Sequence, residues 1–158
     1  KLLAHENYGI KPDVVTLAKG LGGGLPIGAC LCTGALGNVM GASSHGSTFG
    51  GNPIVCAGAS YVLDKVNDEA FLENVRANGE YIREKVLSFK NVKSIRGMGL
   101  MIGVELKEPI AKKINSVLLN EYHYLIGVIG ESVFRIVPPL IITEEDADGF
   151  IEALKKSI

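Results

Sequence analysis

The chain has 158 residues, of which 47% are hydrophobic and 21% charged, and its formal net charge at pH 7 is −1. This composition is typical of a folded globular domain or a piece of one, and it excludes a disordered chain. The small net charge provides no electrostatic attraction to nucleic acid or to an anionic membrane. No apolar run reaches the roughly 18 to 20 residues that span a bilayer, so we expect a cytoplasmic protein.

The first strands are predicted around a glycine-rich turn. Residues 12–19, PDVVTLAK, form a nearly continuous apolar run, which is typical of a strand covered on both faces. Glycines within residues 20–24 end this strand, and residues 25–34 predict a second strand that returns. Glycine accounts for 20 of the 158 residues, a share well above its average usage of about 7%. Many lie within residues 20–60, where the backbone must turn tightly or allow something to approach it.

Two helices follow a loop that is rich in glycine and serine. Asn52 is a good N-cap and Pro53 suits the first helical position, so a helix is predicted to begin there. Apolar residues at helical spacing then predict a long amphipathic helix that ends at about Leu87.

The remainder of the chain mixes strands and helices. The predicted elements are strands at 91–97 and 100–106, a helix opened by Pro109, strands at 125–130 and 133–137, and a final helix begun by Thr143 and Asp146 in a variant capping box. This pattern suggests an α+β subdomain. We place the boundary near Ser88, which gives a first domain at 1–87 and a second at 88–158.

The cysteines and histidines show neither a disulfide framework nor a metal-binding pattern. Cys30 and Cys32 share one face of a predicted strand, and Cys56 lies in an apolar helical stretch. We expect all three to be reduced, buried, small hydrophobic residues. No histidine has a carboxylate or cysteine partner at ligand spacing, so no metal site is predicted.

Lys19 stands at the end of the first apolar strand, directly before the glycines. A lysine amine is a good nucleophile when it is deprotonated, and burial in an apolar site favours that state. The glycines leave space for a flat, bulky group against the backbone, which suits a Schiff base with a carbonyl cofactor. The alternative is a lysine that simply reaches water at the end of a strand. A Walker-type phosphate loop is excluded because the lysine precedes the glycines and no Gly-Lys-Ser/Thr occurs.

Two glycine-rich motifs together resemble a known family. KPDVVTLAKGLGGGLPIGA and HGSTFGGNPIVCAGA are similar to the cofactor-lysine region of class III aminotransferases, the pyridoxal-phosphate enzymes of fold type I. GSTFGGNP most resembles the branch that acts on N-acetylornithine. IRGMGLMIGVEL and VFRIVPPLIITEED resemble the small C-terminal domain of the same enzymes. The resemblance implies an α/β fold: part of a large domain with a mostly parallel sheet, followed by an α+β small domain.

The resemblance assigns roles to matched positions. Lys19 would carry pyridoxal 5'-phosphate covalently, be displaced by the substrate amine, and then shuttle a proton. Thr48, with Ser47 beside it, matches the hydroxyl that reaches the cofactor phosphate of the neighbouring subunit, which implies a homodimer. On the residues alone, this segment could equally be an ordinary Ser/Thr loop.

Arg135 matches an arginine of the small domain that pairs with a carboxylate, either of the substrate or of a protein glutamate. Strand alternation puts it on the face of Val133 and Val137, opposite Phe134 and Ile136. A guanidinium in an apolar strand needs an anionic partner. A purely structural ion pair is the alternative.

The expected activity is transfer of an amino group from N-acetylornithine to 2-oxoglutarate in arginine biosynthesis. Other class III enzymes acting on ornithine, succinylornithine or 4-aminobutyrate are the nearest alternatives, and a noncatalytic oligomerisation or ligand-binding module is an alternative of a different class. The family's phosphate cup, stacking aromatic residue and ring-nitrogen aspartate have no counterpart here, and the chain begins with Lys1 rather than methionine. We therefore expect a C-terminal fragment that is inactive alone.

Overall fold

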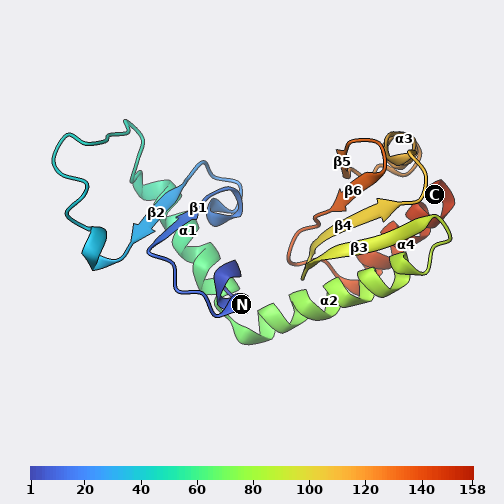
Figure 1. The fold of residues 1–158 in the computed structure, drawn as a ribbon, viewed down its shortest axis with the longest axis horizontal. Helices are drawn as coiled ribbons and strands as arrows, with labels where there is room; N and C mark the ends of the chain where they lie inside the picture. The colour runs from blue at the N-terminus through green and yellow to red at the C-terminus, as the bar shows by residue number, and fades with distance from the viewer. The chain divides into compact units, whose positions relative to one another are not determined.

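The computed structural model describes residues 1–158, which form two compact units, Lys1–Leu72 and Glu73–Ile158 (Figure 1). The division falls within the first turns of helix α2, Glu69–Leu87. The boundary predicted from the sequence lies instead at the end of this helix. The units divide earlier because three α2 residues, Gly79, Ile82 and Val86, are buried in the second unit.

The first unit is built from short elements and one longer helix. In chain order they are the 3-10 helix η1 (Ala4–Tyr8), β1 (Val14–Leu17), η2 (Lys19–Gly22), β2 (Ala29–Cys32), η3 (Gly34–Leu36) and α1 (Pro53–Val66). Strands β1 and β2 pair antiparallel, with Leu17 opposite Ala29. The predicted returning strand is therefore confirmed. The segment between the strands is shorter than the dozen or so residues that a parallel crossover needs.

Helix α1 begins where the sequence predicts. The Asn52 side chain accepts a hydrogen bond from the backbone N–H of Ile54 at 3.0 Å, and Pro53 occupies the first turn. This bond satisfies one of the amide groups that a helix start leaves without an intrahelical partner. The predicted N-cap is confirmed.

The first unit has little buried core, and two expectations about it were wrong. Along β1, Val15 and Leu17 are half-buried while Val14 and Thr16 are exposed, so the strand is partly covered on one face only. The cysteines are free, but Cys30 and Cys32 are exposed and Cys56 is half-buried. The physical reason is that β1 and β2 form a sheet of two strands, and no other element of the first unit covers the face that carries the two strand cysteines.

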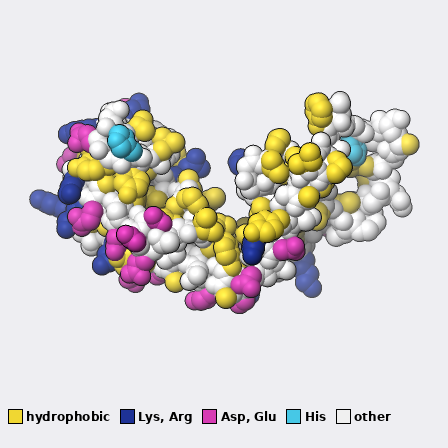
Figure 2. Space-filling model, turned by 180° about the vertical axis from the view of Figure 1, so that it is seen from behind, with side chains coloured by type: hydrophobic (Ala, Val, Ile, Leu, Met, Phe, Trp, Pro, Cys, Tyr) yellow, Lys and Arg dark blue, Asp and Glu magenta, His cyan; other side chains and the backbone are white.

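The surface of the first unit is correspondingly apolar. Hydrophobic side chains, yellow in Figure 2, reach its surface, whereas most charged side chains in this view lie over the second unit. The exposed large hydrophobic residues of the first unit are Tyr8, Ile10, Val14, Leu25, Leu31, Val39, Met40, Phe49, Ile54 and Tyr61.

The second unit is a four-stranded sheet with helices on one face (Figure 1). Its strands are β3 (Val92–Met98), β4 (Met101–Leu106), β5 (Gly127–Ile129) and β6 (Val133–Ile136), in the order β3-β4-β6-β5, and its helices besides α2 are α3 (Ala111–Tyr122) and α4 (Glu144–Ser157). All neighbouring strands are antiparallel. Because the β1–β2 pair is antiparallel too, a mostly parallel sheet is not formed within these residues.

One face of this sheet packs against the helices. Leu100, Ile102, Val104 and Leu106 are all buried, as their alternation predicts, and Phe134 of β6 is fully buried beside them. Helices α2, α3 and α4, together with Val92, Ile126 and Ile136, supply the rest of the core. The opposite face stays open in this chain.

Helix starts in the second unit follow local signals. Thr143 caps α4: its side chain accepts from the N–H of Asp146, and the Asp146 carboxylate accepts from the Thr143 backbone N–H. The predicted capping box is confirmed. Helix α3 begins at Ala111, two residues after Pro109.

The observed mixture of helices and strands confirms the predicted α/β class with a mixed second part. No helix is long and apolar enough to cross a membrane. No group of three or more potential ligand side chains could hold a metal ion.

Candidate active site

Lys19 lies where strand β1 passes into the 3-10 turn η2. Its backbone is left-handed, with φ of 53°, a region that residues other than glycine rarely occupy. Such strain of about 1 to 3 kcal/mol persists where the surroundings fix it, and it is common at functional sites. Hydrogen bonds from Leu21 N–H to the Ala18 carbonyl and from Gly23 N–H to the Gly20 carbonyl, both 3.1 Å, hold the turn.

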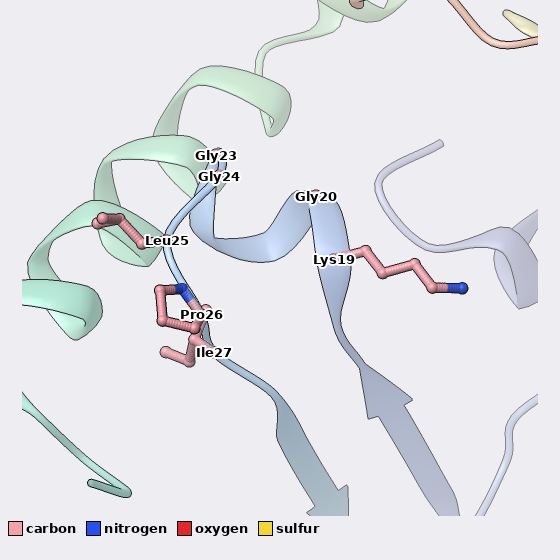
Figure 3. Close-up of a pocket in the computed structure, with 7 residues that line it drawn as sticks. All are labelled: Lys19, Gly20, Gly23, Gly24, Leu25, Pro26 and Ile27. Carbon is pink, nitrogen blue, oxygen red and sulfur yellow. The ribbon is translucent and has the colours of Figure 1, made fainter.

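The Lys19 side chain reaches open space. The residue is exposed, and its amine makes no hydrogen bond or ion pair in this chain. Figure 3 shows the side chain extending away from Leu25, Pro26 and Ile27, so the amine projects on the other side of the loop from these three. The amine is therefore accessible to a group that approaches from outside, and the burial considered from the sequence is not provided by these residues.

The neighbouring glycines leave room for such a group. A Cβ built on Gly20 or on Gly24 would meet no atom within 4 Å. Gly24 also has φ of 109°, which excludes most other residues. The loop also borders a hollow of about 490 Å³, lined by Lys19, Gly20, Gly23, Gly24, Leu25, Pro26 and Ile27, and the Lys19 amine points away from the part of it that residues 25–27 line (Figure 3). An accessible primary amine beside open backbone fits a flat carbonyl cofactor such as pyridoxal phosphate.

Ser47 and Thr48 lie in the exposed loop before α1. Neither hydroxyl has a hydrogen-bond partner in this chain. The loop closes tightly at this point, since the Gly50 N–H donates to the Ser47 carbonyl at 3.3 Å and a Cβ on Gly50 would come within 3.0 Å of the Ser47 Cβ. No hydrogen bond joins either hydroxyl to Lys19. The two hydroxyls are thus available to an anion from outside this chain.

Arg135 occupies the open face of the second unit's sheet. Phe134 and Ile136 on either side of it are buried, so the predicted alternation is confirmed. Its guanidinium lies against Gly127 on the neighbouring strand β5, where a Cβ would be 3.6 Å from Nε. Arg135 has no carboxylate partner within this chain, and the structural ion pair considered from the sequence is therefore not formed by these residues.

Arg96 lies in the same row of the sheet as Arg135, with Gly103 between them. It is exposed, and one of its nitrogens is 3.6 Å from Glu105. Hydrogen bonds from Lys93 and Ser94, with the positive charges of Lys93 and Arg96, hold the pKa of Glu105 below its ordinary value. Arg135 stands outside this network. Of the two arginines, only Arg135 is left without a carboxylate.

Comparison with known proteins decides the family. Residues 1–158 match the family described as Aminotransferase class-III. The chain belongs to this family. It is 45% identical over 152 residues to the acetylornithine aminotransferase of Corynebacterium efficiens, a match that covers 96% of this chain and 37% of that relative.

Solved structures of this family have the same fold. An acetylornithine aminotransferase from Elizabethkingia anophelis matches with a TM-score of 0.87 at 32% identity, over 100% of this chain and 43% of that one. An ornithine aminotransferase from Toxoplasma gondii, described with partial occupancy of PLP at its active site, matches with a TM-score of 0.88 at 32% identity, over 99% of this chain and 38% of that one. The chain thus spans about two fifths of the length of these class III aminotransferases.

Sequence reasoning missed two features of the site. The left-handed backbone of Lys19 has no signal in the sequence, because lysine is not a residue that favours this conformation. The contact between Leu25 and Gly58 of α1 joins segments far apart in the chain. A glycine inside a predicted helix was the one available signal for that contact.

Proposed function

We propose that the protein to which this chain belongs transfers an amino group from N-acetylornithine to 2-oxoglutarate, with pyridoxal phosphate as cofactor. The observation that carries the proposal is the 45% identity to an acetylornithine aminotransferase over nearly the whole chain. The free amine of Lys19, beside glycines that leave open space, supports it. A noncatalytic module would have no use for a strained, exposed lysine at the match to the cofactor lysine.

Each proposed site residue has a defined task. Pyridoxal phosphate, when bound, supplies an aldehyde that takes up the amino group and a conjugated ring that accepts electrons. Lys19 would hold the cofactor through Nζ, and its amine, when not attached to the cofactor, would carry a proton to and from the reacting carbon. Ser47 and Thr48 donate hydrogen bonds to the phosphate of the partner subunit's cofactor. Arg135 binds a substrate carboxylate, a role that suits its planar guanidinium.

The sharpest test of this proposal uses the full-length enzyme with a series of amino donors. N-acetylornithine should give the highest kcat/KM with 2-oxoglutarate as acceptor, above ornithine, succinylornithine and 4-aminobutyrate. The Lys19→Ala variant should lose all but a trace of this activity and should no longer form a borohydride-stable adduct with the cofactor. A preference for ornithine would show that the proposed amino donor is wrong, but the proposed amino-group transfer through Lys19 would stand.

Ornithine is the second candidate donor because a solved ornithine aminotransferase is as similar in fold as the acetylornithine enzyme is. The two donors differ by an acetyl group on the α-amine, which removes a positive charge there. A pocket for the acylated donor must therefore omit the carboxylate that would bind a free α-amine. The donor series above discriminates between the two candidates directly.

We further propose that the enzyme is a cytoplasmic homodimer and that residues 1–158 alone are inactive. The apolar surface of the first unit and the hydroxyls without partners at Ser47 and Thr48 support a second subunit. Sedimentation of the full-length enzyme tests the dimer. Transamination by the isolated 158-residue chain in the presence of pyridoxal phosphate would overturn the second part of the proposal.

A further inference from the structure

Close contacts seat the loop that carries Lys19 on helix α1. A Cβ on Gly58 of α1 would lie 2.5 Å from Leu25 Cδ1, the end of a flexible side chain, and 3.8 Å from the backbone carbonyl oxygen of Gly22. A Cβ on Gly23 would lie 3.0 Å from Cγ2 of Val62, which stands one helical turn after Gly58. Residues four apart share one face of a helix, so Gly58 and Val62 together form the surface that receives the loop.

The loop also packs against itself beneath this contact. Gly22 is buried, and a Cβ there would lie 2.7 Å from Ile27 Cγ2. A β-branched side chain such as isoleucine has little freedom to move aside. Gly22 therefore has no room for a side chain on the side that faces Ile27.

Backbone hydrogen bonds connect this packing to Lys19. Three successive turns are closed by N–H to carbonyl bonds of 3.1 Å: Leu21 to Ala18, Gly23 to Gly20, and Leu25 to Gly22. The turns overlap, so a shift at Leu25 passes along the backbone to the residue whose side chain reacts. Because Lys19 is held in a left-handed conformation that it would not adopt freely, this restraint also sets the direction in which its Cα–Cβ bond leaves the backbone.

We propose that Gly58 is a positioning residue: by receiving Leu25, helix α1 holds the turn that aims the Lys19 amine. This inference rests on the proposed function for the role of the amine. It assigns to Gly58, far from Lys19 in the sequence, a part in catalysis that requires no contact with substrate or cofactor. A bulkier residue at 58 displaces the Leu25 side chain and presses on the Gly22 carbonyl, and so shifts the turn that carries Lys19.

The decisive experiment compares Gly58→Val in the full-length enzyme with Ala57→Val, which adds a β-branched residue at an exposed neighbouring position of the same helix. Trapping reports on the amine: it condenses with the cofactor aldehyde, releasing water, and borohydride donates a hydride that fixes the bond. We expect Gly58→Val to lower the trapping rate at Lys19 and kcat about tenfold to hundredfold. KM should change little, and Ala57→Val should behave like the wild type in all three measurements.

A compensating variant separates positioning from a general loss of folding. The double variant Leu25→Ala with Gly58→Val moves an isopropyl-sized volume from the loop to the helix, and volume-conserving exchanges are tolerated best. It should recover most of the trapping rate. A double variant no better than Gly58→Val, or a Gly58→Val enzyme that traps at the wild-type rate, would overturn the proposal. If Gly58→Val does not fold, Gly58→Ala with the same compensation answers the same question.

Amide hydrogen exchange of the cofactor-free enzyme supplies a readout that does not depend on activity. Residues 19–25 should exchange faster in Gly58→Val than in Ala57→Val, and the double variant should restore their protection. Unchanged protection would contradict the link between α1 and the turn. If the wild-type enzyme fails to trap the cofactor at Lys19, the proposed function fails, while the exchange result still decides whether Gly58 holds the turn.

Discussion

Gly79 of α2 packs directly against the backbone of Gly99 in the turn between β3 and β4, so that a Cβ on Gly79 would lie 2.3 Å from the Gly99 carbonyl oxygen. Arg83, one turn further along α2, donates a hydrogen bond of 2.6 Å to the Gly97 carbonyl of the same turn. Helix α2 thus contacts the backbone of this hairpin turn at two positions, through the Gly79 backbone and through the Arg83 side chain. A side chain at Gly79 would force the helix and the hairpin apart.

The first prediction concerns this contact. Gly79→Ala should destabilise the second unit by about 1 to 3 kcal/mol, the usual cost of overpacking. The direction of the stability change is informative, because the same substitution in an unconstrained helix would stabilise the helix by about 1 kcal/mol. Urea unfolding measures the difference. Glu84→Ala, at an exposed position of the same helix, is the control, and equal stability of the two variants would contradict the contact.

The second prediction concerns the end of α3. His123 is the C-cap residue of this helix and has φ of 62°, in the left-handed region. Glycine adopts this conformation without the steric cost that a Cβ brings. His123→Gly should therefore raise the free energy of unfolding by about 1 kcal/mol, and His123→Val should lower it. Urea midpoints of the two variants give the comparison, and a destabilised glycine variant would mean that the imidazole itself contributes.

The third prediction is a pH dependence. The Tyr81 hydroxyl of α2 donates a hydrogen bond to the Asp148 carboxylate of α4. This bond, together with desolvation and the negative charges of Asp148 and Glu144, raises the pKa of Tyr81 from 10.0 to about 12. Because the pKa is higher in the folded state, the bond's contribution is complete below pH 10.0 and is lost as the pH rises toward about 12.

Tyr81→Phe tests this dependence. The wild type should be more stable than the variant below pH 10.0, and the difference should close as the pH approaches about 12. Denaturant unfolding across that range measures it. Asp148→Asn removes the charged acceptor and should move the phenol titration to lower pH. A constant difference between wild type and Tyr81→Phe would show that the hydroxyl contributes through packing alone.

The fourth prediction tests the carboxylate role of Arg135 in the full-length enzyme. A hydrogen bond to a charged group is worth about 1.5 to 3 kcal/mol, so Arg135→Gln should lower kcat/KM about tenfold to hundredfold. The melting temperature should hardly change, because the side chain is exposed and has no ion pair within the chain. Arg135→Lys should restore only part of the activity, since lysine cannot bind a carboxylate in bidentate fashion.

Arg96→Gln is the matched control, because Arg96 occupies the same row of the sheet but contacts Glu105. Its kcat/KM should stay near the wild-type value. Equal losses for the two arginines would indicate a general electrostatic effect of the sheet face instead of a specific carboxylate site.

Local patterns predicted most of the elements. Asn52 with Pro53, and Thr143 with Asp146, mark helix starts because a short polar side chain satisfies amide groups that the helix itself leaves free. Alternation from Leu100 to Leu106 predicted a buried face, since successive side chains of a strand point to opposite sides. The lysine, glycine and hydroxyl motifs predicted the family for a similar reason: they lie within short continuous segments.

Alternation could not tell which face is covered, and this is why the cysteines were misjudged. Cys30 and Cys32 do share a face of β2, but that face is exposed in this chain. Coverage depends on which other elements pack there. The residues of a strand do not by themselves show which other elements pack against it.

The sequence by itself determined the family, the element order and the identity of the candidate reactive lysine, because each depends on residues close together in the chain. Only the tertiary structure decided the left-handed backbone of Lys19, the seating of Leu25 against Gly58, and the placing of Arg135 beside Gly127. These contacts join segments whose spacing in the sequence is arbitrary. Their geometry follows from close packing, because two atoms cannot occupy the same space.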